Sequence, residues 1–185
     1  MNKLFFSLLL STVFSAQVSG QKQFISRQGQ ISFFSYTSVE NIEAKNNQVL
    51  SILDLEKGEL AVSMLMRAFT FKKDLMYEHF NESYIESDIY PKASFEGKLI
   101  DFDTSSVSSQ TKIIRGTITI HGISKEVDIK TTIKKIDKGY EIDGDFNLVV
   151  DDFNIKIPPI LSKNIASVVS LKIKFQYSPY AQSND

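Results

Sequence analysis

The feature that most constrains the fold is a two-residue alternation of apolar and polar side chains that recurs along most of the chain. It is cleanest in residues 168–177, "VVSLKIKFQY", where apolar residues occupy every second position from Val169 to Tyr177. This period places one face of an extended strand against a core and the other face in water. The sequence therefore predicts a protein built mostly of β-strands.

A hairpin is predicted around the dipeptide His121-Gly122. The segments on either side of it, "KIIRGTITI" and "ISKEVDIKTTI", both alternate, and the inward face of the first includes Ile118. A two-residue turn that contains Gly between two alternating segments is a strong hairpin signal. These residues should form two neighbouring antiparallel strands.

Further segments alternate in the same way, and turn residues separate several of them. They are residues 31–38, 48–55, 59–66, 93–102 and 140–150. About eight short antiparallel strands, each with one apolar face, predict an all-β fold that is either a closed barrel or a sandwich. No internal repeat or compositional break divides the chain, so we expect a single domain over residues 21–185.

One stretch departs from the two-residue period. Between Asp74 and Ser87 the apolar residues Met76, Phe80 and Tyr84 recur every four positions, which predicts a short helix. Asp74 is suited to cap its N-terminus, and the helix should end before Pro91 because the residue preceding a proline favours extended geometry.

The first twenty residues, "MNKLFFSLLLSTVFSAQVSG", resemble a secretory signal peptide. They contain one Lys, a short apolar run and then small residues, which favours cleavage after Gly20 over an uncleaved anchor. We therefore expect a protein of the periplasm or a secreted protein. The chain has no Cys, so neither a lipoprotein anchor nor a disulfide framework is expected.

The charge pattern excludes some classes of partner. The chain has 21 basic and 22 acidic residues, and no cluster or stripe of Lys and Arg. Nucleic-acid binding and electrostatic docking on anionic membranes both depend on such clusters. We expect neither a nucleic-acid partner nor stable membrane insertion, and a homodimer is left open.

The stretch "LMYEHFNESYIESD", residues 75–88, places His79 among several acidic residues and raises the question of a metal site. It lacks the second histidine of H-E-x-x-H, and the other histidine of the chain, His121, lies in the predicted hairpin turn. No nucleophile motif is present either. We therefore expect no metal, no cofactor and no catalytic residue, although two carboxylates meeting across a barrel mouth stay open as an alternative.

The apolar composition suggests a different function. The chain has 14 Phe, 7 Tyr and 4 Met, and many of these residues crowd into positions 64–80. Met and Phe can line an adaptable pocket, or they can simply fill a core. An eight-stranded barrel is about the size at which the interior either just fills or holds one small ligand.

Three elements together resemble the YceI-like family: residues 69–99, residues 114–129 with "GTITIHGISK", and residues 146–158 with "FNLVVDDFNIKIP". The resemblance covers nearly all of the expected mature chain. It implies a lipocalin-like antiparallel barrel with a helical insertion, which binds a polyisoprenoid or another long-chain amphiphile in an apolar tunnel. It also implies that the acidic residues within 75–88 have a structural role at the rim of the barrel and do not form a metal site. A packed barrel that acts as an interaction or stress-response protein remains an alternative, as does a barrel enzyme acting on an apolar substrate.

Alternation along the strands and the four-residue spacing of the helix predict which side chains border such a tunnel. The predicted lipid-binding residues are Met64, Met66, Phe71, Leu75, Phe80, Tyr84, Phe95, Ile118, Phe146, Phe153 and Ile155. A β-bulge would move the residues that follow it to the opposite face.

Overall fold

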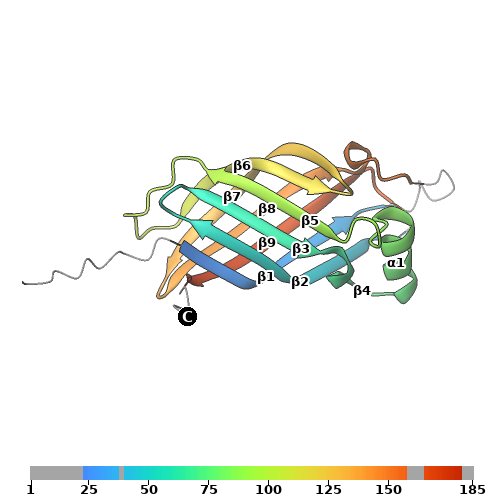
Figure 1. Ribbon diagram of the computed structural model, residues 1–185, viewed down its shortest axis with the longest axis horizontal. Coiled ribbons are helices and arrows are strands. Elements are labelled where there is room, and N and C mark those ends of the chain that lie inside the picture. Colours follow the sequence, from blue (N-terminus) through green and yellow to red (C-terminus); the bar gives the residue numbers. More distant parts are fainter. Residues whose placement is uncertain (1–22, 38–39, 158–164, 181–185) are drawn as a thin grey trace, which may run out of the picture.

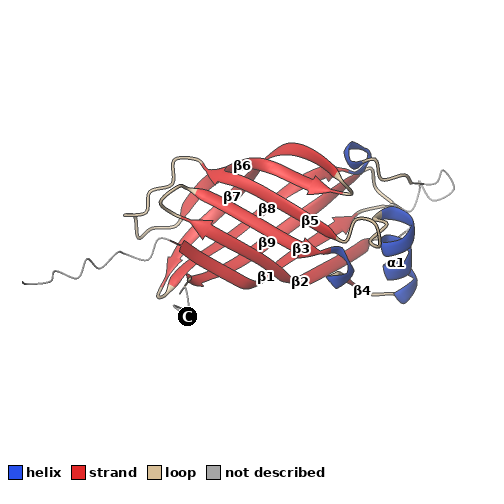
Figure 2. Ribbon diagram, viewed as in Figure 1, coloured by secondary structure: helices blue, strands red, loops and turns tan. Residues whose placement is uncertain are grey.

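The computed structural model describes residues 23–37, 40–157 and 165–180, and most of them are strand (Figure 2). The strands are β1 (Gln23–Ser35), β2 (Ile42–Asp54), β3 (Glu59–Leu65), β4 (Thr70–Phe71), β5 (Lys92–Leu99), β6 (Gln110–Ile120), β7 (Ile123–Ile136), β8 (Gly139–Val149) and β9 (Val168–Pro179). The helical elements are η1 (Met66–Ala68), α1 (Asp74–His79), η2 (Phe80–Tyr84) and η3 (Val150–Phe153). The predicted signal peptide and its cleavage site lie outside the described residues.

The strands form one antiparallel sheet that closes on itself. Its order is β1-β9-β8-β7-β6-β5-β3-β2, and a further pairing between β1 and β2 completes an eight-stranded barrel, while the short β4 adds to β2. Closure pairs the edges that an open sheet would leave exposed. Of the two architectures open from the sequence, the structure is the barrel, and the predicted all-β class with one helical insertion is confirmed.

The two ends of the barrel differ. At one end, here called the helix end, the chain leaves the wall after β3, forms η1, β4, α1 and η2, and returns as β5 (Figure 1). The turn between β6 and β7 and the η3 segment lie at the same end. The opposite end, here called the turn end, carries the β2–β3 and β7–β8 turns and the first residues of β1.

The predicted hairpin turn at His121-Gly122 is confirmed. Ile120 and Ile123 pair across it, and both turn residues have positive φ, 52° at His121 and 73° at Gly122. Two consecutive left-handed residues make a type I′ turn, whose twist matches that of the flanking strands. The turn therefore fixes the register in which Ile118 and its neighbours face the interior.

The predicted helix forms, but its boundaries need correction. It runs from Asp74 to Tyr84, as the α-helix α1 followed by the π-helix η2, and stops short of Ser87 because Glu86 adopts a left-handed conformation with φ 49°. The N-cap is Lys73, without a side-chain capping bond. Asp74 is instead the first helical residue, where its carboxylate interacts favourably with the positive end of the helix dipole.

Aromatic side chains fill the turn end and the middle of the barrel. Phe175 and Tyr177 are each 1 % exposed, and Phe24 packs edge-on against Tyr140 with 5.1 Å between ring centroids. The ring of Phe175 occupies the space that a Cβ on Gly29 would need. The interior at this end therefore resembles a close-packed protein core.

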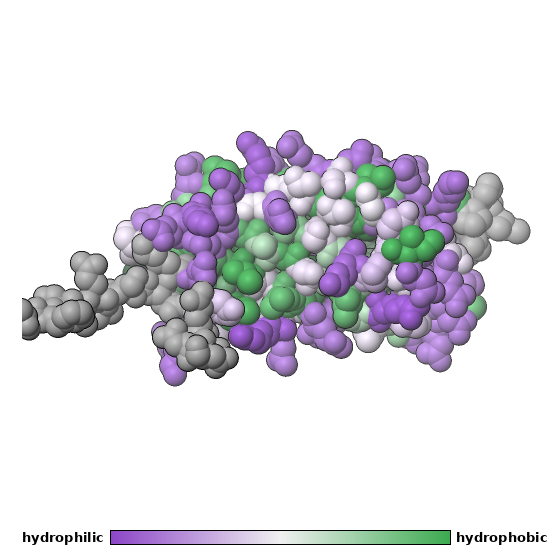
Figure 3. Space-filling model, viewed as in Figure 1, coloured by the Kyte–Doolittle hydropathy of each residue, from purple (hydrophilic) through white to green (hydrophobic). Residues whose placement is uncertain are grey.

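The outer surface is mostly hydrophilic in the view of Figure 3, with hydrophobic residues gathered over the middle of the barrel. Its ion pairs include the bidentate contact of Arg115 with Asp128, at 2.8 Å for both bonds. That contact lowers the pKa of Asp128 below its ordinary value. None of the described helices combines the length and the apolar character that crossing a bilayer requires.

Candidate functional site

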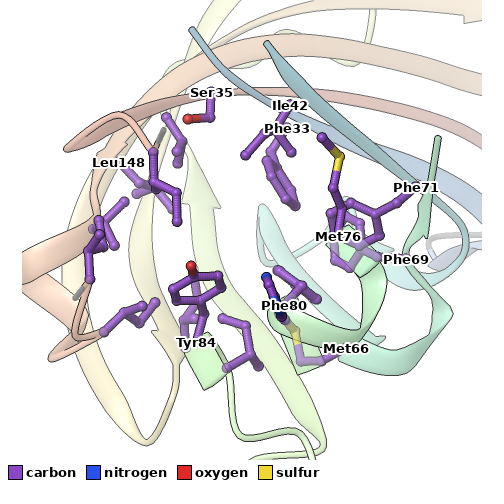
Figure 4. Close-up of a pocket in the computed structure, with 18 of the residues that line it drawn as sticks. Phe33, Ser35, Ile42, Met66, Phe69, Phe71, Met76, Phe80, Tyr84 and Leu148 are labelled. Carbon is purple, nitrogen blue, oxygen red and sulfur yellow. The ribbon is translucent and has the colours of Figure 1, made fainter. Parts of the chain in front are cut away.

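The helix end of the barrel is hollow. It contains a cavity of about 450 Å³ whose wall is predominantly apolar (Figure 4). Side chains from strands, from the helical insertion and from the η3 region point toward this common space. They are Phe33, Ser35, Glu40, Ile42, Met64, Met66, Phe69, Phe71, Lys73, Leu75, Met76, His79, Phe80, Tyr84, Ile85, Ile120, Leu148, Val150, Phe153, Ile155, Ile157, Ile165, Val169 and Leu171.

One wall is a cluster of four rings, Phe33, Phe69, Phe71 and Phe80, here called the phenylalanine cluster. Phe80 stacks on Phe33 with centroids 5.6 Å apart, and its ring is 5.0 Å from that of Phe71. Phe33 comes from β1, Phe71 from β4 and Phe80 from η2. Offset and edge contacts of this kind stabilise aromatic pairs beyond their buried area, so the cluster fixes the helical insertion to the barrel.

The opposite wall comes from the end of β8 and from the η3 region. Leu148, Val150 and Phe153 are buried there, and Phe153 is 2 % exposed. The left-handed Asn154, φ 55° and ψ 24°, ends η3 and is followed by Ile155, which also borders the cavity. Across the space, burial raises the pKa of the Tyr84 phenol above its ordinary value.

Polar groups on the wall are few, and several contact each other or the backbone. The ammonium of Lys73 lies 2.6 Å from the carboxylate of Glu40, which joins the start of the helical insertion to the chain before β2. The hydroxyl of Ser35 accepts a hydrogen bond from the N–H of Ala166 at 2.8 Å. Leu75, which is 60 % exposed, and His79 complete the rim.

His121 holds the helix end together. Its ring nitrogens lie 3.0 Å from the carbonyl oxygen of Phe153 and 2.9 Å from the carboxylate of Glu86, and its ring packs on Tyr90. Carbonyl and carboxylate oxygens both accept hydrogen bonds, so the two contacts form together when both ring nitrogens carry protons. The hairpin turn thereby ties the residues after η2 to those of η3, on two sides of the cavity.

The acidic stretch that raised the question of a metal site contains structural contacts. Glu86 bonds to His121, and Asp88 forms an ion pair with Arg67. Within residues 23–37, 40–157 and 165–180, no three His, Cys, Asp or Glu side chains gather in a way that could hold a metal ion.

The cavity wall includes eight of the eleven predicted tunnel residues. They are Met64, Met66, Phe71, Leu75, Phe80, Tyr84, Phe153 and Ile155. The other three, Phe95, Ile118 and Phe146, face the barrel interior below the cavity, around a separate void of about 30 Å³. Alternation assigned their face correctly, but it carries no information on height along the barrel axis.

Some cavity residues are absent from the prediction. Phe33 is followed by Phe34, which is equally apolar, so the sequence does not show which of the two rings faces the interior. Phe69 directly precedes β4 and borders the cavity together with Phe71, and its spacing of two from Phe71 was a signal that could have identified it. Ile157 and Ile165 lie outside regular strands, where no period applies.

Solved structures with similar folds come from several bacteria. A polyisoprenoid-binding domain from Saccharophagus degradans, implicated in plant cell wall breakdown, has a TM-score of 0.74 at 10% identity and covers 87% of this chain and 100% of its own. BcnA from Burkholderia cenocepacia has a TM-score of 0.67 at 16% identity and covers 79% and 94%. The YCEI protein of Campylobacter jejuni has a TM-score of 0.62 at 16% identity and covers 80% and 90%. At these identities the likeness establishes a shared fold.

Comparison with curated proteins gives no match. The family model described as YceI-like domain matches residues 14–177, and the resemblance seen in the sequence motifs is thereby confirmed. Since this match covers well over half of the chain, the chain belongs to the YceI-like domain family.

Proposed function

We propose that this protein is an exported lipid-binding protein that holds the apolar chain of a polyisoprenoid or a similar amphiphile in the cavity at the helix end. The observation that carries the proposal is the cavity itself, about 450 Å³ in volume and walled mainly by Phe, Met, Leu and Ile side chains. Cavities of this size with a few polar groups are typical of small-molecule sites.

The distribution of polar groups suits an amphiphile. Each methylene transferred from water to the wall contributes about 0.8 kcal/mol to binding. Lys73, Glu40 and His79 border the cavity together with the exposed Leu75, so a polar head can remain hydrated near them while the chain lies inside. Met64, Met66 and Met76 give the wall adaptable side chains, which suits chains of varied shape.

Family membership and fold support the same class of ligand. The structural neighbour from Saccharophagus degradans is described as a polyisoprenoid-binding domain. The signal-peptide-like start of the sequence supports a role outside the cytoplasm, in sequestration or transport of the ligand.

We infer binding rather than catalysis. The wall's acid and amine, Glu40 and Lys73, neutralise each other, and Ser35 is bonded to the backbone. The remaining polar members, His79 and Tyr84, lie in a predominantly apolar wall. A binding site requires only this apolar enclosure, whereas an enzyme requires a nucleophile or base aligned with a partner.

Native mass spectrometry of protein purified without detergent tests the proposal. The expected result is a lipid-sized adduct at one ligand per chain, or uptake of one added prenyl alcohol or fatty acid per chain. A folded protein that takes up neither class of compound would contradict it.

A further inference from the structure

The interior of the barrel is divided into two spaces. The cavity at the helix end has a volume of about 450 Å³, and the void below it has a volume of only about 30 Å³. The walls of the two spaces share only Met64 and Leu171 among the described residues. These two side chains therefore form the floor of the cavity.

The floor is built from strands that enclose the barrel from different sides. Met64 lies on β3 and pairs with Ala93 of β5, and Leu171 lies on β9 and pairs with Phe146 of β8. Met64 is 7 % exposed and Leu171 is 6 % exposed.

Phe95 fills much of the space beneath the floor. The Phe95 ring lies so close to Gly97 that a Cβ on Gly97 would be 2.6 Å from the ring's Cζ atom. A Cβ on Gly116, which faces Gly97 across the strand pair, would come within 2.5 Å of the Cα of Gly97. The two glycines leave no side chains between β5 and β6 at this level, so the Phe95 ring folds down against the wall. The void that remains has room for roughly one water-sized group.

Further toward the turn end the interior is closed. Phe175 packs against Tyr177 with 5.9 Å between centroids, and the Tyr177 hydroxyl bonds to Ser51 at 2.6 Å. A long chain therefore meets packed side chains below Met64.

We propose that the cavity takes at most about fifteen carbons of a single apolar chain and that the floor formed by Met64 and Leu171 sets this limit. The number follows from the cavity volume of about 450 Å³ and roughly 30 Å³ for each group the size of a water molecule. This inference rests on the proposed lipid-binding function and bounds its ligand. Fatty acids of up to about fifteen carbons and triprenyl chains fit completely, whereas the remainder of a longer fatty acid or polyisoprenoid stays outside the rim.

A chain-length series tests the limit. Saturated fatty acids of eight to twenty-four carbons, used below their micelle concentrations, displace a dansyl-labelled eleven-carbon fatty acid from the wild-type protein. Affinity should rise by up to about fourfold with each added methylene while the chain is being buried. The rise should stop near fifteen carbons, and the chain length at which it stops is here called the break.

Variants at the floor test the role of Met64. Met64→Ala removes three heavy atoms and opens the cavity to the void, so the break should move up by about three carbons. Phe95→Leu alone enlarges a space that the ligand cannot reach and should leave the break in place. The double variant should move it beyond the Met64→Ala position.

Met66→Ala is the matched control, because Met66 borders the cavity but not the void. It removes the same atoms, and Phe95→Leu should add nothing to it. Thermal unfolding of every variant establishes that it is folded. Met64→Val, which keeps an apolar side chain, replaces Met64→Ala if the latter does not fold.

The outcomes separate the two proposals. If the folded wild-type protein binds no chain of any length, the lipid-binding function itself is wrong. If affinity rises without a break through twenty carbons, lipid binding stands and the length limit is overturned. A break near fifteen carbons that a folded Met64→Ala or Met64→Val variant does not move would remove Met64 from the role.

Discussion

The turn end and the helix end of this barrel are crossed by the same strands, yet one is packed and the other is hollow. At the turn end the interior holds Phe175, Tyr177 and their neighbours, which are almost completely buried. At the helix end the apolar side chains stand around a cavity of about 450 Å³. Strand number alone therefore does not decide whether a barrel of this size is filled.

Two local features explain the difference. In the packed part, aromatic rings occupy the space beside glycines, Phe95 beside Gly97 and Phe175 beside Gly29. The rings thereby fill the interior where the glycines contribute no side chain. At the helix end the chain leaves the wall after β3, and the insertion places Phe69, Phe71 and Phe80 along one side of the space.

The largest expected effect contrasts one phenylalanine from each end. Phe175→Ala should lower the free energy of unfolding by about 3–5 kcal/mol, because it leaves a cavity in a packed interior. Phe80→Ala should cost roughly 1–2 kcal/mol, since its ring already borders open space. Chemical denaturation of both variants measures the difference, and equal losses would show that the two ends are packed alike.

His121→Asn tests what holds the helix end in place. Asn tolerates the left-handed turn conformation, but it cannot reproduce the links to Glu86 and Phe153. We expect a loss of about 1–2 kcal/mol in unfolding free energy. Amide hydrogen exchange should accelerate around residues 80–90 and 150–157, with little change in β7 to β9 near the turn end. Uniform acceleration would mean that the two ends are not independent.

Tyr177→Phe probes a polar contact in the packed end, which joins Ser51 of β2 to Tyr177 of β9. The Ser51 hydroxyl donates to the carbonyl of Ala61, so the Tyr177 hydroxyl donates to Ser51. Burial raises the pKa of Tyr177, which keeps this donor protonated across the usual range of pH. Its loss should cost about 1 kcal/mol in thermal unfolding and leave ligand affinity unchanged. A change in affinity would show that the packed end influences the cavity.

The smallest effect is a pH dependence at the β2–β3 turn. Hydrogen bonds from Gln23 and from the backbone N–H groups of Lys57 and Glu56 lower the pKa of Asp54 below its ordinary value of 3.8. A carboxyl whose folded pKa is depressed stabilises the protein above its unfolded pKa, and this stabilisation is lost as the pH falls through the folded pKa. Asp54→Asn should therefore lower stability by less than about 1 kcal/mol at pH 7, and the difference from wild type should shrink below about pH 4. A constant difference in melting temperature between pH 7 and pH 3 would contradict this.

The sequence predicted the strands well because they alternate cleanly and several turns carry their own signals. Alternation left a barrel and a sandwich open, and the resemblance to the YceI-like family implied the barrel. The pairing of Ile120 with Ile123 across His121-Gly122 follows from local chemistry alone. The predicted helix was three residues too long, since nothing in the sequence marks the left-handed conformation of Glu86.

The cavity was less predictable than the fold. Alternation identifies the inward face, so Met64 and Phe95 were both predicted to border one tunnel. It does not reveal that a ring folded over Gly97 closes the middle of the barrel, because that depends on the pairing of Gly97 with Gly116 on another strand. Phe33 was missed because the adjacent Phe34 is equally apolar, so the sequence does not show which of the two rings faces inward.

The most direct test of the central claim compares two neighbouring glutamate substitutions at the helix end. Met66 is 5 % exposed and borders the cavity, whereas the preceding Leu65 is 49 % exposed and does not. A fluorescent fatty-acid probe should bind the wild-type protein and Leu65→Glu alike, and Met66→Glu more than tenfold more weakly, because an unpaired carboxylate is costly in an apolar cavity. Melting curves identify any unfolded variant. Met66→Gln, whose side chain has the shape of Glu without its charge, replaces Met66→Glu if needed. A folded Met66 variant with undiminished probe affinity would contradict the claim that this cavity holds the ligand.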